Sequence, residues 1–279
     1  MKKACVIGWP INHSRSPLIH NYWLKKHGII GSYERIAVEP ENLKKFIHNL
    51  ASSGFEGCNV TIPHKENAIQ AVDHYDEKVA QTGSLNTVFI RDNKTHATST
   101  DGDGFYKNVL THCPSLTIDQ KNVMILGAGG SSRAIVQNLL SKNAKSIFVY
   151  NRTKERALEL QNVFGNKIIP VAELEIARYL TQTDLLVNTI PQTPRCHSSI
   201  LLQLDILPKQ AIVADIVYVP LKTELIKKAE QLGLRTVPGL GMLLHQAVEG
   251  FHLWFGVRPE VTQELYDLVA ADIISGQPK

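Results

Sequence analysis

Lys65 and Asp101 are the residues of this sequence whose types and surroundings point most directly to chemistry. Lys65 ends the polar stretch NVTIPHK (59–65), and Asp101 stands in TSTDGDG (98–104). An ammonium group can donate a proton to a carbonyl oxygen as hydride arrives, or accept an alcohol proton in the reverse direction. A carboxylate can position that lysine through a charge-assisted hydrogen bond. The two residues therefore predict one proton-transfer centre.

Side chains with hydroxyl or amide groups stand near the ends of the predicted strands. They are Ser14 and Ser16 in NHSRSP (12–17), Asn59 and Thr61 in NVTIPHK, and Asn86 in SLNTV (84–88). Ligands of open α/β sheets bind beyond the carboxyl ends of the strands, so we expect these side chains to line one crevice with Lys65 and Asp101. Many hydroxyl and amide groups around one ammonium and one carboxylate predict a polyhydroxylated ligand.

These residues also have structural interpretations. Ser16 can cap a helix whose first residue is Pro17, because the N–H that proline lacks is not needed there. Asn86 can belong to a turn, Asp101 can cap a helix, and Lys65 can be an exposed lysine. Taken singly, each structural interpretation is the commoner case. A ligand site is favoured because, without one, the structural interpretations of all these residues would have to hold at the same time.

The stretch ILGAGGSSRA (125–134) follows a predicted strand and opens a predicted helix. Gly127 permits the tight turn, and Gly129 lets the backbone approach a pyrophosphate at the N-terminus of the helix. The third position of the GxGxxG pattern is Ser132 instead of glycine. The motif alone is weak evidence, since such a turn also occurs where no ligand binds.

The end of the next predicted strand, SIFVY (146–150), distinguishes the two nicotinamide cofactors. NAD-binding folds place an acidic residue there to hold the ribose 2′-hydroxyl. This sequence has Asn151, Arg152 and Thr153 instead, with Arg156 one turn later. Arginine matches the charge and shape of a 2′-phosphate, so the pattern predicts NADP. The structural alternative is an exposed helix start capped by Thr153.

The elements that must position these residues form two α/β series. In the first, strands are expected at 4–8, 33–38 and 56–62, a hairpin at 84–100, and helices at 17–28 and 40–54. In the second, strands are expected at 121–126, 146–150, 184–189, 211–216 and 234–237, with helices from the glycine turn to about Asn143 and at 154–165. Two apolar helices, at 238–256 and 259–274, follow.

This pattern predicts an α/β protein of two domains. The N-terminal domain is expected to contain a mixed sheet and to bind substrate, with the C-terminal helices returning to it, over residues 1–102 and 241–279. The other is expected to be a Rossmann-type NADP-binding domain over residues 103–240.

The composition argues against several other classes of protein. With 279 residues, 43% hydrophobic and 20% charged, and a net charge of +4, the chain is typical of a globular protein and not of one that binds nucleic acid. Its four cysteines, Cys5, Cys58, Cys113 and Cys196, are far apart, so we expect no metal site or disulfide framework, and a reducing cytoplasm. The apolar runs are too short for a signal peptide or a membrane span.

The sequence resembles the shikimate dehydrogenase family over nearly its whole length. The resemblance rests on these stretches, in this order: NHSRSP, NVTIPHK, GSLNTV, STDGDG, GAGGSSRA, NRTKER, DIVY and GLGMLLHQA. It implies the NADP-dependent, reversible reduction of 3-dehydroshikimate to shikimate, a step of aromatic amino acid biosynthesis. Lys65 and Asp101 match the acid–base pair of the family.

The resemblance also assigns ligand contacts. Contacts to shikimate or 3-dehydroshikimate fall on Ser14, Ser16, Thr61, Asn86, Tyr218 and Gln246, with Asn59 nearby. Contacts to NADP fall on Glu77, Gly127, Ala128, Gly129, Gly130, Ser131, Asn151, Arg152, Thr153, Arg156, Ile216 and Gly239. Ser14 and Ser16 would offer their hydroxyls to the substrate carboxylate, which the N-terminus of the helix behind Pro17 also favours.

Several alternatives stay open at this point. A quinate/shikimate dehydrogenase of the same fold would use NAD, which Arg152 and Arg156 disfavour. A non-catalytic sensor of shikimate-like acids or NADP would need neither Lys65 nor Asp101. A reductase of another polyol is also compatible with these residues. The sequence leaves undecided whether the protein is a monomer or a homodimer, and which of Lys65 and Asp101 is the immediate proton donor.

Overall fold

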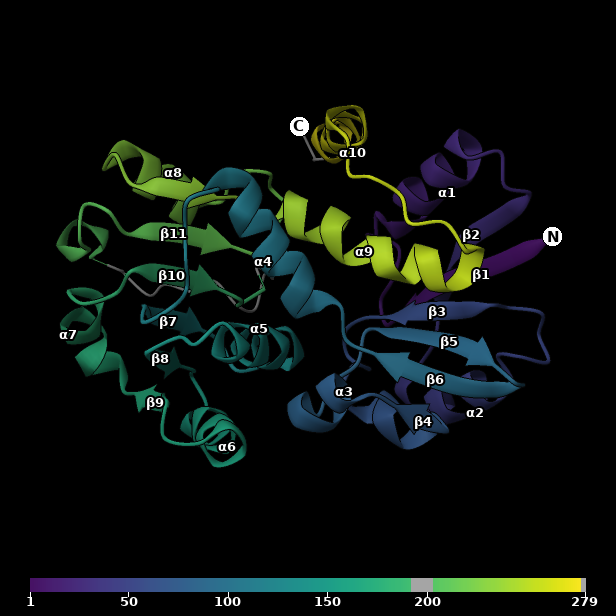
Figure 1. Ribbon diagram of the computed structural model, residues 1–279, viewed down its shortest axis with the longest axis horizontal. Helices are drawn as coiled ribbons and strands as arrows, with labels where there is room; N and C mark the ends of the chain where they lie inside the picture. Colours follow the sequence, from purple (N-terminus) through teal and green to yellow (C-terminus); the bar gives the residue numbers. More distant parts are fainter. Residues whose placement is uncertain (192–202, 277–279) are drawn as a thin grey trace. The chain divides into compact units, whose positions relative to one another are not determined.

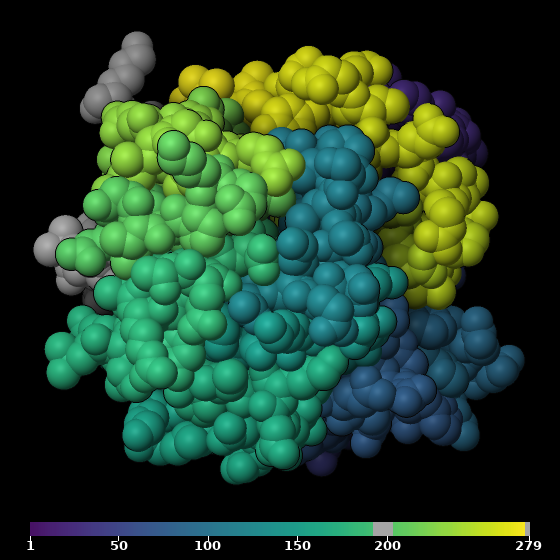
Figure 2. Space-filling model, turned by 60° about the vertical axis from the view of Figure 1, so that its left-hand side comes forward, coloured from purple at the N-terminus to yellow at the C-terminus, as the bar shows by residue number. Residues whose placement is uncertain are grey.

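The computed structural model describes residues 1–191 and 203–276, which are drawn in colour in Figure 1 and Figure 2. Cys196 lies outside the described residues. The chain divides into two compact units. Unit 1 comprises residues 1–104 and 243–271, and unit 2 comprises the described residues between 105 and 242 together with 272–276. Within the described ranges, no helix is both long and apolar enough to span a membrane.

Unit 1 alternates short strands with helices along its N-terminal part. Its strands are β1 (Lys2–Gly8), β2 (Gly31–Ala37), β3 (Gly57–Val60), β4 (His74–Tyr75), β5 (Thr87–Arg91) and β6 (Lys94–Thr98). Its helices there are α1 (Ser16–Lys26), α2 (Leu43–His48) and α3 (Glu77–Thr82), with the 3-10 turns η1 (Pro40–Asn42) and η2 (Asn67–Ala71). Then α4 (Asp101–His112) begins, and the C-terminal helices are α9 (Leu240–Phe255) and α10 (Gln263–Ser275).

The strands of unit 1 form a mixed sheet in the order β2-β1-β3-β5-β6-β4 (Figure 1). β1 pairs in parallel with β2 and β3, whereas β5 pairs antiparallel with β3 and β6. The predicted hairpin is confirmed as β5 and β6, since Asp92 and Asn93 take φ values of 52° and 58° that suit a tight two-residue turn. Ile7 pairs with Val60, so the carboxyl ends of β1 and β3 lie side by side.

Helices cover both faces of this sheet. On one face, Leu43 and Ile47 of α2 join Ile7 of β1 in an apolar core. On the other face, Trp254 of α9 donates from Nε1 to the Val88 carbonyl at 2.9 Å. Figure 2 shows the C-terminal helices, in yellow, next to the purple N-terminal segment. The prediction that the C-terminal helices return to the first domain is confirmed.

Unit 2 begins its sheet with the strand that precedes the glycine turn. Its described strands are β7 (Asn122–Leu126), β8 (Ser146–Tyr150), β9 (Ile168–Val171), β10 (Leu185–Asn188), β11 (Ile212–Asp215) and β12 (Arg235–Val237). Its described helices, after α4, are α5 (Gly130–Ser141), α6 (Lys154–Phe164), α7 (Ile176–Leu180) and α8 (Glu224–Gln231), with the 3-10 turns η3 (Glu173–Glu175) and η4 (Leu204–Ile206).

The described strands of unit 2 form a parallel sheet in the order β12-β11-β10-β7-β8-β9. This is the Rossmann order, in which the chain reverses direction across the sheet beside β7. Successive residues of β7 face opposite sides: Ile125 packs in one core with Ile135 of α5, and Met124 packs in the other with Leu180 of α7. The predicted α/β architecture is therefore confirmed.

One predicted helix is shorter in the structure, and several elements, β9 among them, were not predicted. The helix expected at 40–54 is shorter, because η1 precedes α2 and the helix ends at His48. Beyond that end, the Ser52 hydroxyl donates to the Asn49 carbonyl at 3.0 Å, a local bond that competes with helix continuation. β9 contains Pro170. The strand tolerates proline because it is at the edge of the sheet.

Candidate functional site

Ser14 and Ser16 lie at the start of α1, but not in the predicted arrangement. The helix begins at Ser16, with Arg15 in the N-cap position and no side-chain cap. The prediction that Ser16 caps a helix starting at Pro17 is therefore wrong. Instead, Oγ of Ser14 accepts a hydrogen bond from the backbone N–H of Ser16 at 3.3 Å, because a serine two residues upstream can form this local turn. Both serines are buried.

Asn59, near the end of β3, has its carboxamide engaged inside unit 1. Its NH₂ group donates to the Asn86 carbonyl at 3.1 Å and to Oγ1 of Thr87 at 3.3 Å. Its Oδ1 accepts from the hydroxyl of Tyr33 at 2.6 Å. Asn59 thus holds its neighbours in place.

The turn after β3 places Thr61 and Lys65. The N–H of Thr61 donates to the Ile7 carbonyl at 3.0 Å, which ties the turn to β1. His64 is buried, and its Nε2 lies 2.7 Å from the Val38 carbonyl. The carbonyl of Lys65 accepts from the N–H of Leu85 at 2.9 Å. The backbone on both sides of Lys65 is therefore anchored, while its side chain extends toward α4.

Lys65 and Asp101 form an ion pair through Nζ and Oδ2. Their side chains are only 14% and 6% exposed. Asp101 is the first residue of α4, where the helix N-terminus favours a negative charge. A buried ion pair adds little net stability, because desolvation of the charges offsets their attraction. The arrangement is therefore better suited to chemistry than to holding the fold together.

Asn86 connects this pair to the C-terminal helix. Its NH₂ group donates to Oδ1 of Asp101 at 2.9 Å and to Oε1 of Gln246 at 3.1 Å. Its Oδ1 accepts from the N–H of Thr100 at 2.8 Å. Gln246 reaches this position because α9 passes close to Gly104, where a Cβ would lie 2.6 Å from Cβ of Gln246. One buried polar network thus contains the ion pair, Asn59, Asn86 and Gln246.

Three members of this network, Thr87, Thr100 and Tyr33, were not predicted. Thr100 binds Asn86 through both its N–H and its hydroxyl, and its position next to Asp101 was the available signal. Tyr33 binds Asn59, which is 26 positions away in the sequence. No local pattern marks such a long-range partner of a strand tyrosine.

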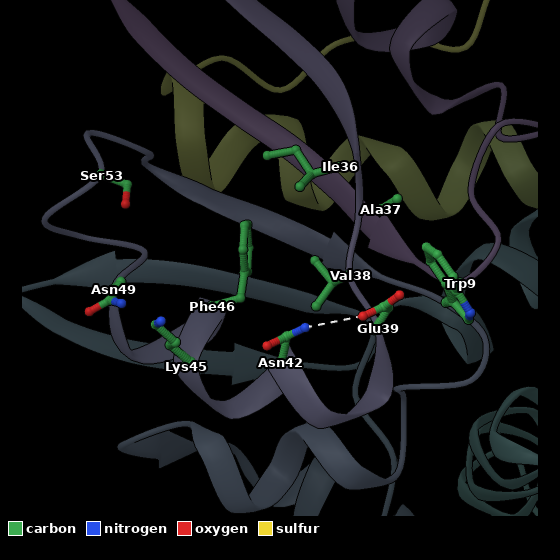
Figure 3. Close-up of a pocket in the computed structure, with 10 residues that line it drawn as sticks. All are labelled: Trp9, Ile36, Ala37, Val38, Glu39, Asn42, Lys45, Phe46, Asn49 and Ser53. Atoms are coloured by element: carbon green, nitrogen blue, oxygen red, sulfur yellow. Dashed lines mark hydrogen bonds between the residues drawn. The ribbon is translucent and has the colours of Figure 1, made fainter.

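A separate hollow of about 450 Å³ lies along the end of β2 and one side of α2 (Figure 3). Trp9, Val38 and Phe46 provide apolar surface, and Glu39 accepts a hydrogen bond from Asn42 at its rim. The predicted catalytic and substrate-binding residues are not among those that line it. The hollow is therefore distinct from the polar network.

The glycine turn of unit 2 joins β7 to α5. Gly127 has φ of +104°, and a Cβ there would lie 2.4 Å from Oγ1 of Thr189, so the position requires glycine. Ser132, which replaces the third glycine of the motif, donates from its hydroxyl to the Gly127 carbonyl at 2.6 Å. The Ala128 N–H donates to Oδ1 of Asn151 at 3.1 Å. The departure from the motif thus stabilises the turn.

The basic stretch after β8 lies on the surface of unit 2. Arg152, Thr153 and Arg156 are exposed. Thr153 occupies the N-cap position of α6 but makes no side-chain cap hydrogen bond. The structural alternative, in which Thr153 caps the helix, therefore lacks support. The Asn151 NH₂ group donates to the Thr153 carbonyl at 2.8 Å, which shapes the stretch.

Ile216 and Tyr218 lie on the segment that follows β11. The carboxylate of Asp215 fixes this segment, since it accepts from the Val217 N–H at 3.0 Å and from the Thr223 hydroxyl at 2.7 Å. Burial raises the pKa of Asp215, and these hydrogen bonds oppose the shift. The backbone of Gly239 lies close to this segment, so that a Cβ there would be only 2.5 Å from the Ile216 carbonyl oxygen.

These residues of unit 2 fit NADP. A Cβ at Gly129 would face open space, and α5 starts there without a side-chain cap, so its first N–H groups suit a pyrophosphate. The exposed arginines suit a 2′-phosphate. Glu77, which was also assigned to the cofactor, belongs to unit 1, where its carboxylate accepts from Nε2 of Gln81 at 2.8 Å.

Family models match consecutive parts of the chain. They are the shikimate dehydrogenase substrate binding domain at residues 6–88, shikimate / quinate 5-dehydrogenase at 111–238, and the shikimate 5′-dehydrogenase C-terminal domain at 239–263. A curated relative from Nitrobacter winogradskyi, shikimate dehydrogenase (NADP(+)), is 46% identical over 273 residues, which are 98% of this chain and 97% of the relative. This chain belongs to the shikimate dehydrogenase family.

Solved structures of the shikimate dehydrogenase family have the same fold. Shikimate 5-dehydrogenase from Thermus thermophilus, in complex with NADP(H) and shikimate, gives a TM-score of 0.83 at 29% identity, covering 98% of this chain and 100% of that one. Quinate dehydrogenase from Corynebacterium glutamicum, in complex with NAD, gives 0.86 at 28% identity, covering 97% and 100%. The substrate-binding model matches within unit 1, and the dehydrogenase model matches within unit 2.

Proposed function

We propose that this chain catalyses the reversible, NADP-dependent reduction of 3-dehydroshikimate to shikimate in aromatic amino acid biosynthesis. The observation that carries the proposal is the buried ion pair of Lys65 and Asp101 inside a network of amide and hydroxyl groups. Curated relatives that are 46% and 47% identical to this chain are named shikimate dehydrogenase (NADP(+)). The pair supplies acid–base chemistry, and the network suits a ring that carries several hydroxyls.

The substrate carboxylate and hydroxyls have matching partners in unit 1. Ser14 and Ser16 offer hydroxyls to the carboxylate, and the first N–H groups of α1 add favourable partial charge. Thr61, Asn86 and Gln246 offer hydrogen bonds to the ring hydroxyls. Asn59 holds Asn86 in position through its hydrogen bond to the Asn86 carbonyl. Tyr218 is assigned to the substrate on the family resemblance.

Lys65 handles the proton of the reaction. NADPH, when bound, supplies a hydride to the carbonyl carbon of 3-dehydroshikimate. The carbonyl oxygen gains negative charge as this happens and takes a proton from Nζ of Lys65, which yields the hydroxyl of shikimate. Asp101 holds the ammonium through the ion pair and is itself held by Asn86. In the reverse direction, the neutral amine accepts the hydroxyl proton.

The residues of unit 2 are assigned to the cofactor in the same proposal. The backbone from Gly127 to Ser131 receives the pyrophosphate, and Asn151, Arg152, Thr153 and Arg156 receive the adenosine ribose with its 2′-phosphate. Ile216 and Gly239 are assigned to the nicotinamide end, and Glu77 of unit 1 is assigned to the cofactor on the family resemblance. We also propose that the protein works in the cytoplasm, in keeping with the free thiols of Cys5, Cys58 and Cys113.

The absorbance of reduced nicotinamide tests this function. Purified protein is mixed with shikimate or quinate, each with NADP or with NAD, and the initial rates of the four reactions are compared. We expect the highest kcat/KM for shikimate with NADP. A preference for quinate with NAD would favour the activity of the Corynebacterium relative instead. Binding of shikimate without turnover in any combination would support a sensor.

A further inference from the structure

Tyr33 is a buried tyrosine that none of the assigned roles uses. It lies in β2, at the edge of the mixed sheet, and is 3% exposed. The strand pairs with β1, and the N–H and carbonyl of Tyr33 are bound by a side chain. The Asn21 carboxamide of α1 donates to the Tyr33 carbonyl at 2.9 Å and accepts from the Tyr33 N–H at 3.0 Å. This two-point contact fixes Tyr33 against the helix that begins with Ser16.

The ring of Tyr33 is held by packing that does not involve its hydroxyl. It stacks on the ring of His20, with centroids 4.1 Å apart and planes 14° apart. His20 stacks in turn against Phe251 of α9, at 5.9 Å. A phenylalanine would keep this stack, so the contribution of the hydroxyl can be tested separately from that of the ring.

The hydroxyl of Tyr33 stands between two residues assigned to the substrate. It donates to Oδ1 of Asn59 at 2.6 Å. Burial raises the pKa of Tyr33 well above its usual value, and interactions with Asn59 and then with the Ser16 side chain oppose part of that shift. The hydroxyl therefore stays protonated and remains a donor. Ser16 comes from α1 and Asn59 from β3, so this group links the helix to the strand.

The contact sets which way the Asn59 carboxamide points. With the Tyr33 hydroxyl as donor, Oδ1 must face it, and the NH₂ group must face Thr87 and the Asn86 carbonyl. The Thr87 hydroxyl in turn donates to Oδ1 of Asn86 at 3.1 Å, and the Asn86 NH₂ group donates to Oδ1 of Asp101. A continuous chain of buried hydrogen bonds therefore runs from the hydroxyl of Tyr33 to the proton-transfer pair. Without the hydroxyl, the orientation of Asn59 is no longer specified from that side.

We propose that Tyr33 is a positioning residue of the substrate site: its hydroxyl orients Asn59, and through Asn59 it holds Asn86 in the geometry that binds the substrate. This inference rests on the proposed function, because it takes shikimate as the ligand of Asn86. Tyr33 acts through its neighbours and is not itself assigned a contact with the substrate.

The test is Tyr33→Phe, measured by shikimate binding in calorimetry and by steady-state kinetics. Without the donor, Asn59 and Asn86 are no longer held in the geometry that binds the substrate, and losing about one hydrogen bond to shikimate corresponds to a rise of about 2- to 13-fold in its Kd and KM. The KM for NADP and kcat should stay within about twofold of wild type. Tyr22→Phe is the matched control, since it removes an exposed hydroxyl of α1 that binds Glu264 at 2.7 Å. It should leave all constants unchanged.

A double-mutant cycle separates positioning from general damage. If Tyr33 acts through Asn59, Tyr33→Phe combined with Asn59→Ala should raise the shikimate Kd no further than Asn59→Ala alone. Effects that multiply, an unchanged Kd in Tyr33→Phe, or equal losses for shikimate and NADP would overturn the inference. If the wild-type protein binds shikimate but does not turn it over, the proposed catalytic function is refuted. The comparison of shikimate Kd values then still tests the role of Tyr33. Wild-type protein that does not bind shikimate would end both.

Discussion

Lowering the pH from about 7.5 to about 5 should weaken the folding of unit 1 through His20. This histidine is completely buried in α1, among the rings of Tyr33, Phe251, Trp23 and Trp254. A proton on its ring would place a charge in an apolar core, and such burial is costly. The folded protein therefore keeps the ring neutral.

The size and sign of the effect follow from the pKa. Burial lowers the pKa of His20 to about 3, against 6.5 for a histidine in the unfolded chain, and the Asn59 side chain opposes part of the shift. Between these values the unfolded chain binds a proton that the folded unit excludes. The stabilisation is complete above the unfolded pKa and is lost as the pH falls below it. The loss is about 1.4 kcal/mol per pH unit, or about 2 kcal/mol at pH 5.

Tryptophan fluorescence can follow this unit alone. The three tryptophans, Trp9, Trp23 and Trp254, all belong to unit 1. Urea unfolding would be measured at both pH values for wild type and for His20→Phe, which keeps a ring in the stack but cannot titrate. The loss of stability on acidification should be about 2 kcal/mol smaller in the variant. His48→Gln, at an exposed histidine of α2, is the control and should behave as wild type.

An equal loss of unfolding free energy in wild type and His20→Phe would refute this reasoning. It would mean that His20 does not hold a depressed pKa in the folded protein. A variant that is less stable at both pH values but has a smaller pH dependence would still agree with it. The comparison is made within each protein, so a packing cost of the larger ring cancels.

Two further predictions concern unit 2. Arg152→Ala should raise the KM for NADP about 10- to 150-fold, because one strong hydrogen bond to a charged group is lost. The KM for NAD should change far less. Steady-state kinetics with both cofactors would show equal changes if Arg152 does not bind the 2′-phosphate. Gly129→Val should fold normally, since a Cβ there faces open space, yet should lose NADP affinity because the side chain fills the space above the start of α5. Unchanged cofactor binding by calorimetry would contradict the assignment of the turn.

The fold and the members of the candidate site could be predicted because both depend on short-range patterns. Parallel strands end at one edge of a sheet, so polar residues just after strands are expected near each other. The turns after β1 and β3 meet in this way, since these strands are parallel neighbours. Asn86 meets Asn59 for a different reason: β5 runs antiparallel to β3, which places the start of β5 beside the end of β3. The glycine turn was similarly visible, because a strand, a GxG pattern and a helix follow one another within a few residues.

The internal contacts of the site could not be predicted, because they depend on partners far apart in the sequence or on exact backbone geometry. Tyr33 meets Asn59 only once β1 has paired with both β2 and β3. Ser16 does not cap α1 as expected, because the helix starts one residue earlier, and Oγ of Ser14 accepts from the N–H of Ser16 instead. Gln246 reaches Asn86 across 160 positions.

The central claim is that Lys65 transfers the proton and that Asp101 positions it. The most direct test is kcat of Lys65→Ala, measured beside the Kd values for shikimate and NADPH of the same preparation. We expect kcat to fall about 10²- to 10⁴-fold, as is typical when a positioned general acid is removed, while both ligands still bind. Asp101→Ala should fall comparably, and the double variant should lose little more, since the two residues act as a unit. Near-normal turnover in Lys65→Ala would contradict the claim and place the proton donor elsewhere.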